Sequence, residues 1–188
     1  MIYSKAAVKG LADLKGKKIR TAGPTETEFT RALGMTPVAV APSEIYTALQ
    51  QGLIDGNWVA DAPHFFNKGF EVTKFIFDVG SAGAGFFVMV NEKAIEALPP
   101  DSKKALMDAL TTYVAALRKG TQEGSTNGRQ WLIKEGMTAV PVPPEDRTTM
   151  QKAAVEIVDK WQKRLDPEGH KIYEKVKAMV DDYNAKKK

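Results

Sequence analysis

The residue of this chain best suited to ligand chemistry is Arg20, in the stretch DLKGKKIRTAGPTETEFTRALG (13–34). The stretch predicts a short strand over 17–22 and then, almost at once, a helix. In an open α/β sheet, ligands bind beyond the carboxyl ends of the strands. A guanidinium presents a planar fork that fits a carboxylate in two parallel hydrogen bonds. Arg20 is therefore a candidate carboxylate receptor; the alternative is a solvated arginine at a strand end, beside an ordinary capped helix.

The turn after Arg20 is suited to bring backbone groups close to the same ligand. Gly23 has no side chain, and the proline after it fixes the turn. A capping-box pattern begins at Thr25, which predicts that residue as the helix N-cap. Such a helix start directs unpaired N–H groups and partial positive charge at an anion. We therefore expect Thr21 and Gly23 to line the substrate site together with Arg20.

A second candidate group follows the third predicted strand, in DGNWVADAPHF (55–65). Asn57, Trp58 and Asp61 come at the edge of the sheet where Arg20 is expected. Trp58 could form a wall against the apolar body of a ligand, with its indole N–H as a donor. It could equally be a core tryptophan. His64 has no second histidine nearby, so the sequence does not favour a metal-binding or acid–base role for it.

A third candidate lies in GAGFFVMVN (83–91), where we expect Phe86, or alternatively Phe87, to line a cleft while most of this run forms a buried strand. The glycines allow close approach of another segment or a ligand. They do not match a dinucleotide-binding or phosphate-binding loop, so nothing here favours nucleotide binding.

Composition and motif content exclude several functional classes. The 188 residues are 43% hydrophobic and 27% charged, as in globular proteins, and the chain has no cysteine. The net charge is +4, but its basic residues are not interleaved with aromatic ones, so we expect no nucleic-acid partner. No nucleophile is accompanied by a convincing base, and no metal-ligand pattern occurs. The sequence therefore predicts neither an enzyme nor a bound cofactor or metal.

The elements needed to position these residues divide the chain near residue 98. In residues 1–97, short apolar runs alternate with helical segments, which predicts an α/β lobe with a mainly parallel sheet flanked by helices. Residues 98–188 predict a C-terminal helical segment with no strands of its own. We expect strands over 17–22, 36–41, 53–60 and 70–80.

Four blocks of the sequence resemble, in order and spacing, the DctP-like solute-binding proteins of tripartite ATP-independent periplasmic (TRAP) transporters. They are LADLKGKKIRTAG, ALGMTPVAVAPSEIYTALQQGLIDG, FEVTKFIF and FFVMVNEKAIEALPPDSKKAL. The resemblance covers about residues 4–115 and continues more weakly through the C-terminal helices. It implies a two-lobed, periplasmic-binding-protein-like fold that closes on a small organic acid. It also implies periplasmic localisation, although the residues given contain no export signal, and delivery of the ligand to the membrane permease subunits.

The resemblance assigns the carboxylate-binding arginine to Arg20 and implies hinge strands near 17–22 and 85–91. Many relatives have an asparagine in a DGQENP-like stretch that touches the ligand. This chain has DGNWVADAP there, so either Asn57 takes that role or Val59 occupies its position.

Relatives also usually carry a first lobe before the region that matches here. The C-terminal helices are then expected to pack against that other lobe and the hinge. The resemblance therefore leaves a second hypothesis open, a ligand-incompetent module that self-associates as a homodimer.

Overall fold

The sheet at the centre of the computed structural model has six strands, and the structure describes residues 1–79 and 87–186. The strand order is β3-β2-β4-β1-β5-β6. The strands are β1 (Ile2–Ser4), β2 (Lys18–Thr21), β3 (Thr36–Ala39), β4 (Gly56–Trp58), β5 (Phe75–Phe77) and β6 (Thr138–Val140). All neighbours are parallel except β1, which is antiparallel to β4 and to β5. The predicted α/β class with a mainly parallel sheet is thus confirmed, as a mixed sheet.

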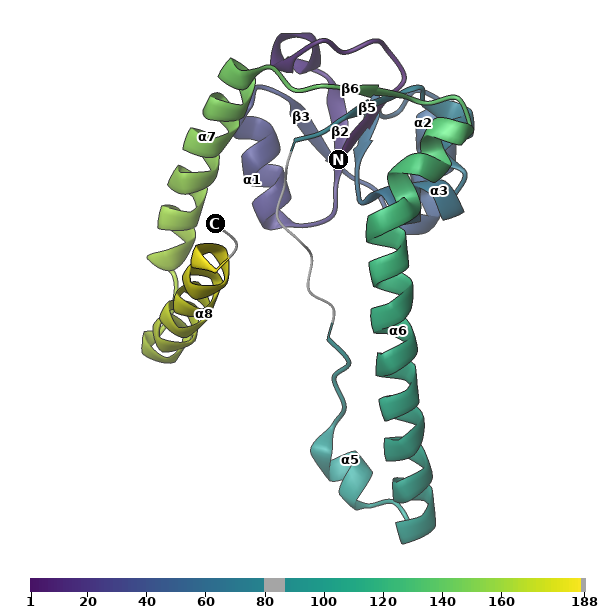
Figure 1. The fold of residues 1–188 in the computed structure, drawn as a ribbon, viewed down its shortest axis with the longest axis vertical. Helices are drawn as coiled ribbons and strands as arrows, with labels where there is room; N and C mark the ends of the chain where they lie inside the picture. Colours follow the sequence, from purple (N-terminus) through teal and green to yellow (C-terminus); the bar gives the residue numbers. More distant parts are fainter. Residues whose placement is uncertain (80–86, 187–188) are drawn as a thin grey trace.

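Helices cover both faces of this sheet. They are α1 (Pro24–Ala32), α2 (Ile45–Gln50), α3 (Asp61–Phe66), α4 (Gly69–Val72), α5 (Glu92–Glu96), α6 (Pro100–Lys134), α7 (Pro144–Gln162) and α8 (Pro167–Ala185), with short 3-10 turns at Leu11–Leu14 and Pro42–Glu44. In Figure 1, α6 and the α7–α8 pair run away from the sheet as two separate arms. None of the helices in the described part is long and apolar enough to cross a membrane.

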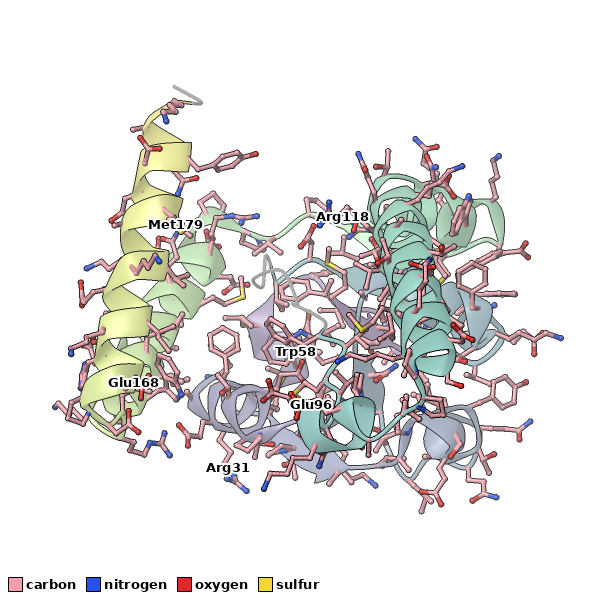
Figure 2. The ribbon with its side chains drawn as sticks, turned by 90° about the horizontal axis from the view of Figure 1, so that it is seen from below. Arg31, Trp58, Glu96, Arg118, Glu168 and Met179 are labelled. Atoms are coloured by element: carbon pink, nitrogen blue, oxygen red, sulfur yellow. The ribbon has the colours of Figure 1, made fainter. Side chains whose placement is uncertain are left out.

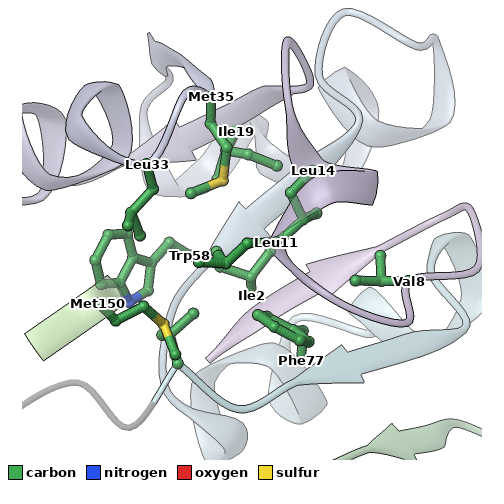
Figure 3. Close-up of a cluster of buried hydrophobic side chains, with 11 residues drawn as sticks. Ile2, Val8, Leu11, Leu14, Ile19, Leu33, Met35, Trp58, Phe77 and Met150 are labelled. Carbon is green, nitrogen blue, oxygen red and sulfur yellow. The ribbon is translucent and has the colours of Figure 1, made fainter. Parts of the chain in front are cut away.

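The hydrophobic core lies in layers on the two sides of the sheet. On one side, Ile2, Ile19 and Trp58 pack with Leu33 after α1 and Met150 of α7 (Figure 3). On the other side, Tyr3 and Ile76 pack with Leu132 of α6, and a separate cluster lies under α2. Because side chains alternate along a strand, neighbouring residues such as Asn57 and Trp58 enter different layers.

Several boundaries differ from the sequence-based expectation. The helix after β2 begins at Pro24 with Gly23 as N-cap, so Thr25 is not the cap that we predicted. Proline is well suited to the first helical position, because its missing N–H has no partner there in any case. Of 70–80, only Phe75–Phe77 is a strand, since Gly69–Val72 forms α4. The second half also contributes a strand, β6, contrary to the prediction.

The buried strand predicted around GAGFFVMVN is wrong for the residues that the structure describes there. Residues 87–91 lie in no helix or strand, and Phe87 and Met89 are 84% and 88% exposed. A strand needs a neighbour to pair with, and in the described ranges none lies beside this segment. The hinge strand expected near 85–91 is therefore not formed over 87–91. Phe86 lies outside the described residues.

A candidate ligand site at the carboxyl edge of the sheet

Arg20 lies on β2 with its side chain almost fully enclosed, at 6% exposure. Its Nε donates a hydrogen bond of 3.1 Å to the carbonyl oxygen of Val40. Burial lowers the pKa of Arg20, and the nearby Glu26 carboxylate acts in the opposite direction. Within residues 1–79 and 87–186, no carboxylate forms an ion pair with this guanidinium. The cation is thus held in place without being neutralised by a direct partner.

Asn57 lies beside Arg20 on the neighbouring strand β4. The two residues are register partners, so their side chains project on the same face of the sheet. Asn57 is 2% exposed, and its Oδ1 is buried without a hydrogen-bond partner among the residues that the structure describes. An unpaired buried oxygen costs about 1–3 kcal/mol. Arg20 and Asn57 are therefore a pair of buried polar side chains on one face of the sheet.

Val59 and Trp58 have different surroundings from each other. Val59 is half-buried against the cluster of Tyr3 and Ile76, and its N–H donates to the carbonyl of Met1 at 3.1 Å. Trp58 is 6% exposed in the opposite layer, with its ring centroid 5.3 Å from that of Phe29. The structure therefore favours the core interpretation of Trp58 and does not bring it together with Arg20 and Asn57.

The turn that follows β2 is closed by its own side chains. Thr21 is 4% exposed, and its hydroxyl is 2.9 Å from that of Thr27. Gly23 has extended backbone, and a Cβ built on it would meet no atom within 4 Å. Glu26, in the first turn of α1, accepts a hydrogen bond of 2.6 Å from the Ala22 N–H. A carboxylate therefore already lies at the helix start where we expected only N–H donors.

Asp61, the first residue of α3, belongs to a charged network at the same edge. It accepts hydrogen bonds from the Tyr3 hydroxyl and from Arg129 Nε of α6, the latter at 3.2 Å. Arg129 also reaches Asp78, after β5, at 3.4 Å. Burial and the bond to Asp61 raise the pKa of Tyr3. Asp61 thus connects β1, α3 and α6. A contact between Asp61 and a ligand would use a carboxylate that already accepts hydrogen bonds from Tyr3 and Arg129.

The sequence reasoning missed Arg129, which comes from 68 residues away from Asp61. A signal for the contact was present in Gly124 and Gly128, one turn apart on α6. A Cβ on Gly124 would lie 2.7 Å from the Cβ of Ala62, and one on Gly128 would lie 2.9 Å from the Cβ of Asp61. These glycines let α3 approach α6 closely enough for Arg129 to reach its partners.

His64 is explained by packing. It is 2% exposed, stacks on Tyr3 with ring centroids 3.6 Å apart, and its Nε2 is 2.8 Å from the Thr73 hydroxyl. That hydroxyl donates to the carbonyl of Gly69, so it accepts from a neutral imidazole. Among the described residues, no three His, Cys, Asp or Glu side chains are placed to hold a metal ion.

The sequence of this chain matches a known protein family. The model of the bacterial extracellular solute-binding proteins, family 7 (DctP), matches residues 1–164. The chain belongs to this family. The predicted resemblance to TRAP solute-binding proteins is thereby confirmed.

Individual relatives show how much of the family's length is represented. A solute-binding protein of Verminephrobacter eiseniae is 30% identical over 141 residues, which are 74% of this chain and 42% of the relative. The C4-dicarboxylate-binding periplasmic protein DctP of Rhodobacter capsulatus is 28% identical over 155 residues, 80% of this chain and 45% of the relative. This chain spans about half the length of the curated relatives it matches.

Solved structures support the same fold. A Bordetella pertussis extracytoplasmic solute receptor binding pyroglutamic acid superposes with a TM-score of 0.81 at 24% identity, over 92% of this chain and 57% of the receptor. A TRAP periplasmic solute-binding protein of Roseobacter denitrificans with bound L-galactonate gives a TM-score of 0.77 at 28% identity, over 93% and 56%.

Proposed function

We propose that this chain forms the ligand-binding lobe of a TRAP solute-binding protein and holds a small organic acid by its carboxylate at Arg20. The observation that carries the proposal is the enclosed guanidinium at the carboxyl edge of the sheet, without an ion-pair partner in the described part of the chain. A buried cation without a counter-ion is costly, and a bound carboxylate would supply two charge-assisted hydrogen bonds. Relatives that are named for their ligands bind acids such as C4-dicarboxylates and 2,3-diketo-L-gulonate.

The remaining roles follow from this assignment. The protein acts outside the cytoplasm, in the periplasm, and passes its ligand to the membrane permease subunits of a TRAP transporter. Thr21, Gly23 and Asn57 surround the carboxylate end of the ligand. Val59 and Asp61, which follow β4, contact the ligand from the side of that strand. Its role is binding and delivery, so no residue is assigned to catalysis.

Calorimetry with a panel of organic acids tests the proposal on the 188-residue chain. Arg20→Ala should weaken binding at least about thirtyfold, because truncating one partner of a buried charge pair costs about 2 kcal/mol or more. Arg31→Ala is the matched control, since it removes an exposed arginine from α1. Affinity that is unaffected by Arg20→Ala, or no binding of any acid, would refute the assignment.

A second candidate function, self-association, is favoured by two apolar stripes that the fold leaves exposed. On α8, Ile172, Val176 and Met179 are 60%, 53% and 64% exposed, and α8 buries none of its residues. On the outer half of α6, Tyr113 and Val114 are 55% and 41% exposed. Exposed patches of this kind mark interaction surfaces.

A second copy of the chain suits these stripes, because both follow helical spacing and lie on separate arms of the molecule. In Figure 2, Met179 on α8 lies well apart from Arg118 on α6. A two-fold axis would pack α8 of each copy on α6 of the other and cover both stripes at once. Light scattering should then give a dimer, which Val176→Lys disrupts and Lys175→Glu leaves intact. A clean monomer at tens of micromolar contradicts this candidate.

A further inference from the structure

The charges around Arg20 bear on which acids the site accepts. Glu26 is half-buried at the start of α1, and its carboxylate is tied by a bond of 2.6 Å to the N–H of Ala22, two residues after Arg20. The negative charge of Glu26 is therefore fixed by the backbone that follows Arg20. Glu26 acts against the lowering of the Arg20 pKa by burial, and it forms no ion pair with the guanidinium.

Two other cations lie at this edge. The Met1 ammonium donates to the Val59 carbonyl at 3.0 Å; burial lowers its pKa, and Asp61, Asp78 and Glu26 act in the opposite direction. Arg129 is shared by Asp61 and Asp78, so its charge is already engaged by two carboxylates. In residues 1–79 and 87–186, Arg20 is thus the arginine at this edge without an ion-pair partner, and the Glu26 carboxylate is held at the end of the same strand.

We propose that Glu26 determines specificity by favouring acids with one net negative charge, or zwitterions with a cationic or N–H group near the carboxylate, over dianions. The inference rests on the proposed carboxylate site at Arg20. One carboxylate pairs with Arg20, while a positive or N–H group on the same ligand lies toward the second oxygen of Glu26. A dianion instead brings its second charge toward a fixed like charge.

Three ligands of solved or curated relatives supply matched probes. Pyroglutamate is a monoanion with a ring N–H, ectoine is a zwitterion and succinate is a dianion; each is named for at least one relative. Calorimetry on the full 188-residue chain should show pyroglutamate or ectoine binding more tightly than succinate. Glu26→Gln should shift the affinity ratio toward succinate by about fivefold, the upper range for a charge that is partly screened by solvent.

Glu28→Gln is the control variant, because Glu28 is on the same helix but pairs with Arg164 of the α7–α8 connection at 3.3 Å. It should leave the ratio unchanged. The inference is overturned if succinate is the preferred ligand of the parent chain, or if Glu26→Gln and Glu28→Gln alter the ratio equally. Absence of binding by every acid would instead overturn the carboxylate site itself, and this inference with it.

Discussion

Replacing Gly128 of α6 with alanine should loosen the contact that holds one side of the candidate site. The added Cβ would lie 2.9 Å from the Cβ of Asp61 and 3.0 Å from the backbone nitrogen of Ala62. Neither atom is at the end of a flexible side chain, so α3 as a whole must move away from α6. That displacement would separate Asp61 from Arg129.

Gly120 of the same helix provides the matched control, since a Cβ there would meet no atom within 4 Å. Both substitutions gain about 1 kcal/mol of helix propensity. Only Gly128→Ala adds overpacking, which costs about 1–3 kcal/mol. The difference in unfolding free energy between the two variants should therefore equal the overpacking cost, with Gly128→Ala the less stable.

Urea unfolding followed by circular dichroism measures this difference, provided that both variants keep the same dependence on denaturant. Equal midpoints for Gly128→Ala and Gly120→Ala would refute the close contact between α3 and α6. They would also remove the basis for describing Asp61 and Arg129 as one network.

Three further predictions concern buried groups. Burial lowers the pKa of His64 from 6.5 to about 3, so the unfolded state takes up the proton first; stability is complete above pH 6.5 and is lost as the pH falls toward 3. Between pH 7 and 5 this should cost about 2 kcal/mol in urea titrations, and His64→Phe should lose less over the same range. Gly69→Ala should unfold at much lower urea, because its Cβ would lie 2.2 Å from the His64 ring; an unchanged midpoint would contradict the stacking. Arg20→Met should abolish acid binding yet leave the urea midpoint unchanged or higher, whereas a loss above about 2 kcal/mol would mark Arg20 as structural.

The sequence predicted the parts of the fold that depend on local sequence patterns. The strand that carries Arg20 and the helical character of the chain over Pro100–Lys134 follow from hydrophobic periodicity. Local patterns could not predict β1 and β6. Both are short, and each forms only because a distant strand supplies the hydrogen bonds: β1 pairs with β4 and β5, and β6 pairs with β5.

The candidate site likewise combines residues that local sequence patterns predicted with contacts that come from distant parts of the chain. The residues around Arg20 predicted its position at a strand end. The parallel order of the strands predicted that Asn57 lies close to Arg20. The hydrogen bonds of Asp61 to Tyr3 and Arg129 could not be predicted, because these partners come from a strand and a helix at remote points of the chain. Trp58 and Asn57 were predicted to act together, but a period of two residues places adjacent strand residues in opposite layers.

The stability of Arg20→Met distinguishes a ligand-binding role of Arg20 from a structural role more directly than the contacts of Arg20 do. A side chain that serves the fold should be satisfied by the fold, as Arg129 is by its two carboxylates. Arg20 is equally polar and more deeply enclosed, yet within residues 1–79 and 87–186 its Nε bonds only a carbonyl, and it lies next to an amide oxygen that has no partner there. Both features cost folding free energy, and a bound acid would offset the cost at the guanidinium. A site of this kind is stabilised by its ligand, so the chain should gain stability with a bound acid in proportion to the logarithm of its concentration, and Arg20→Met should gain none.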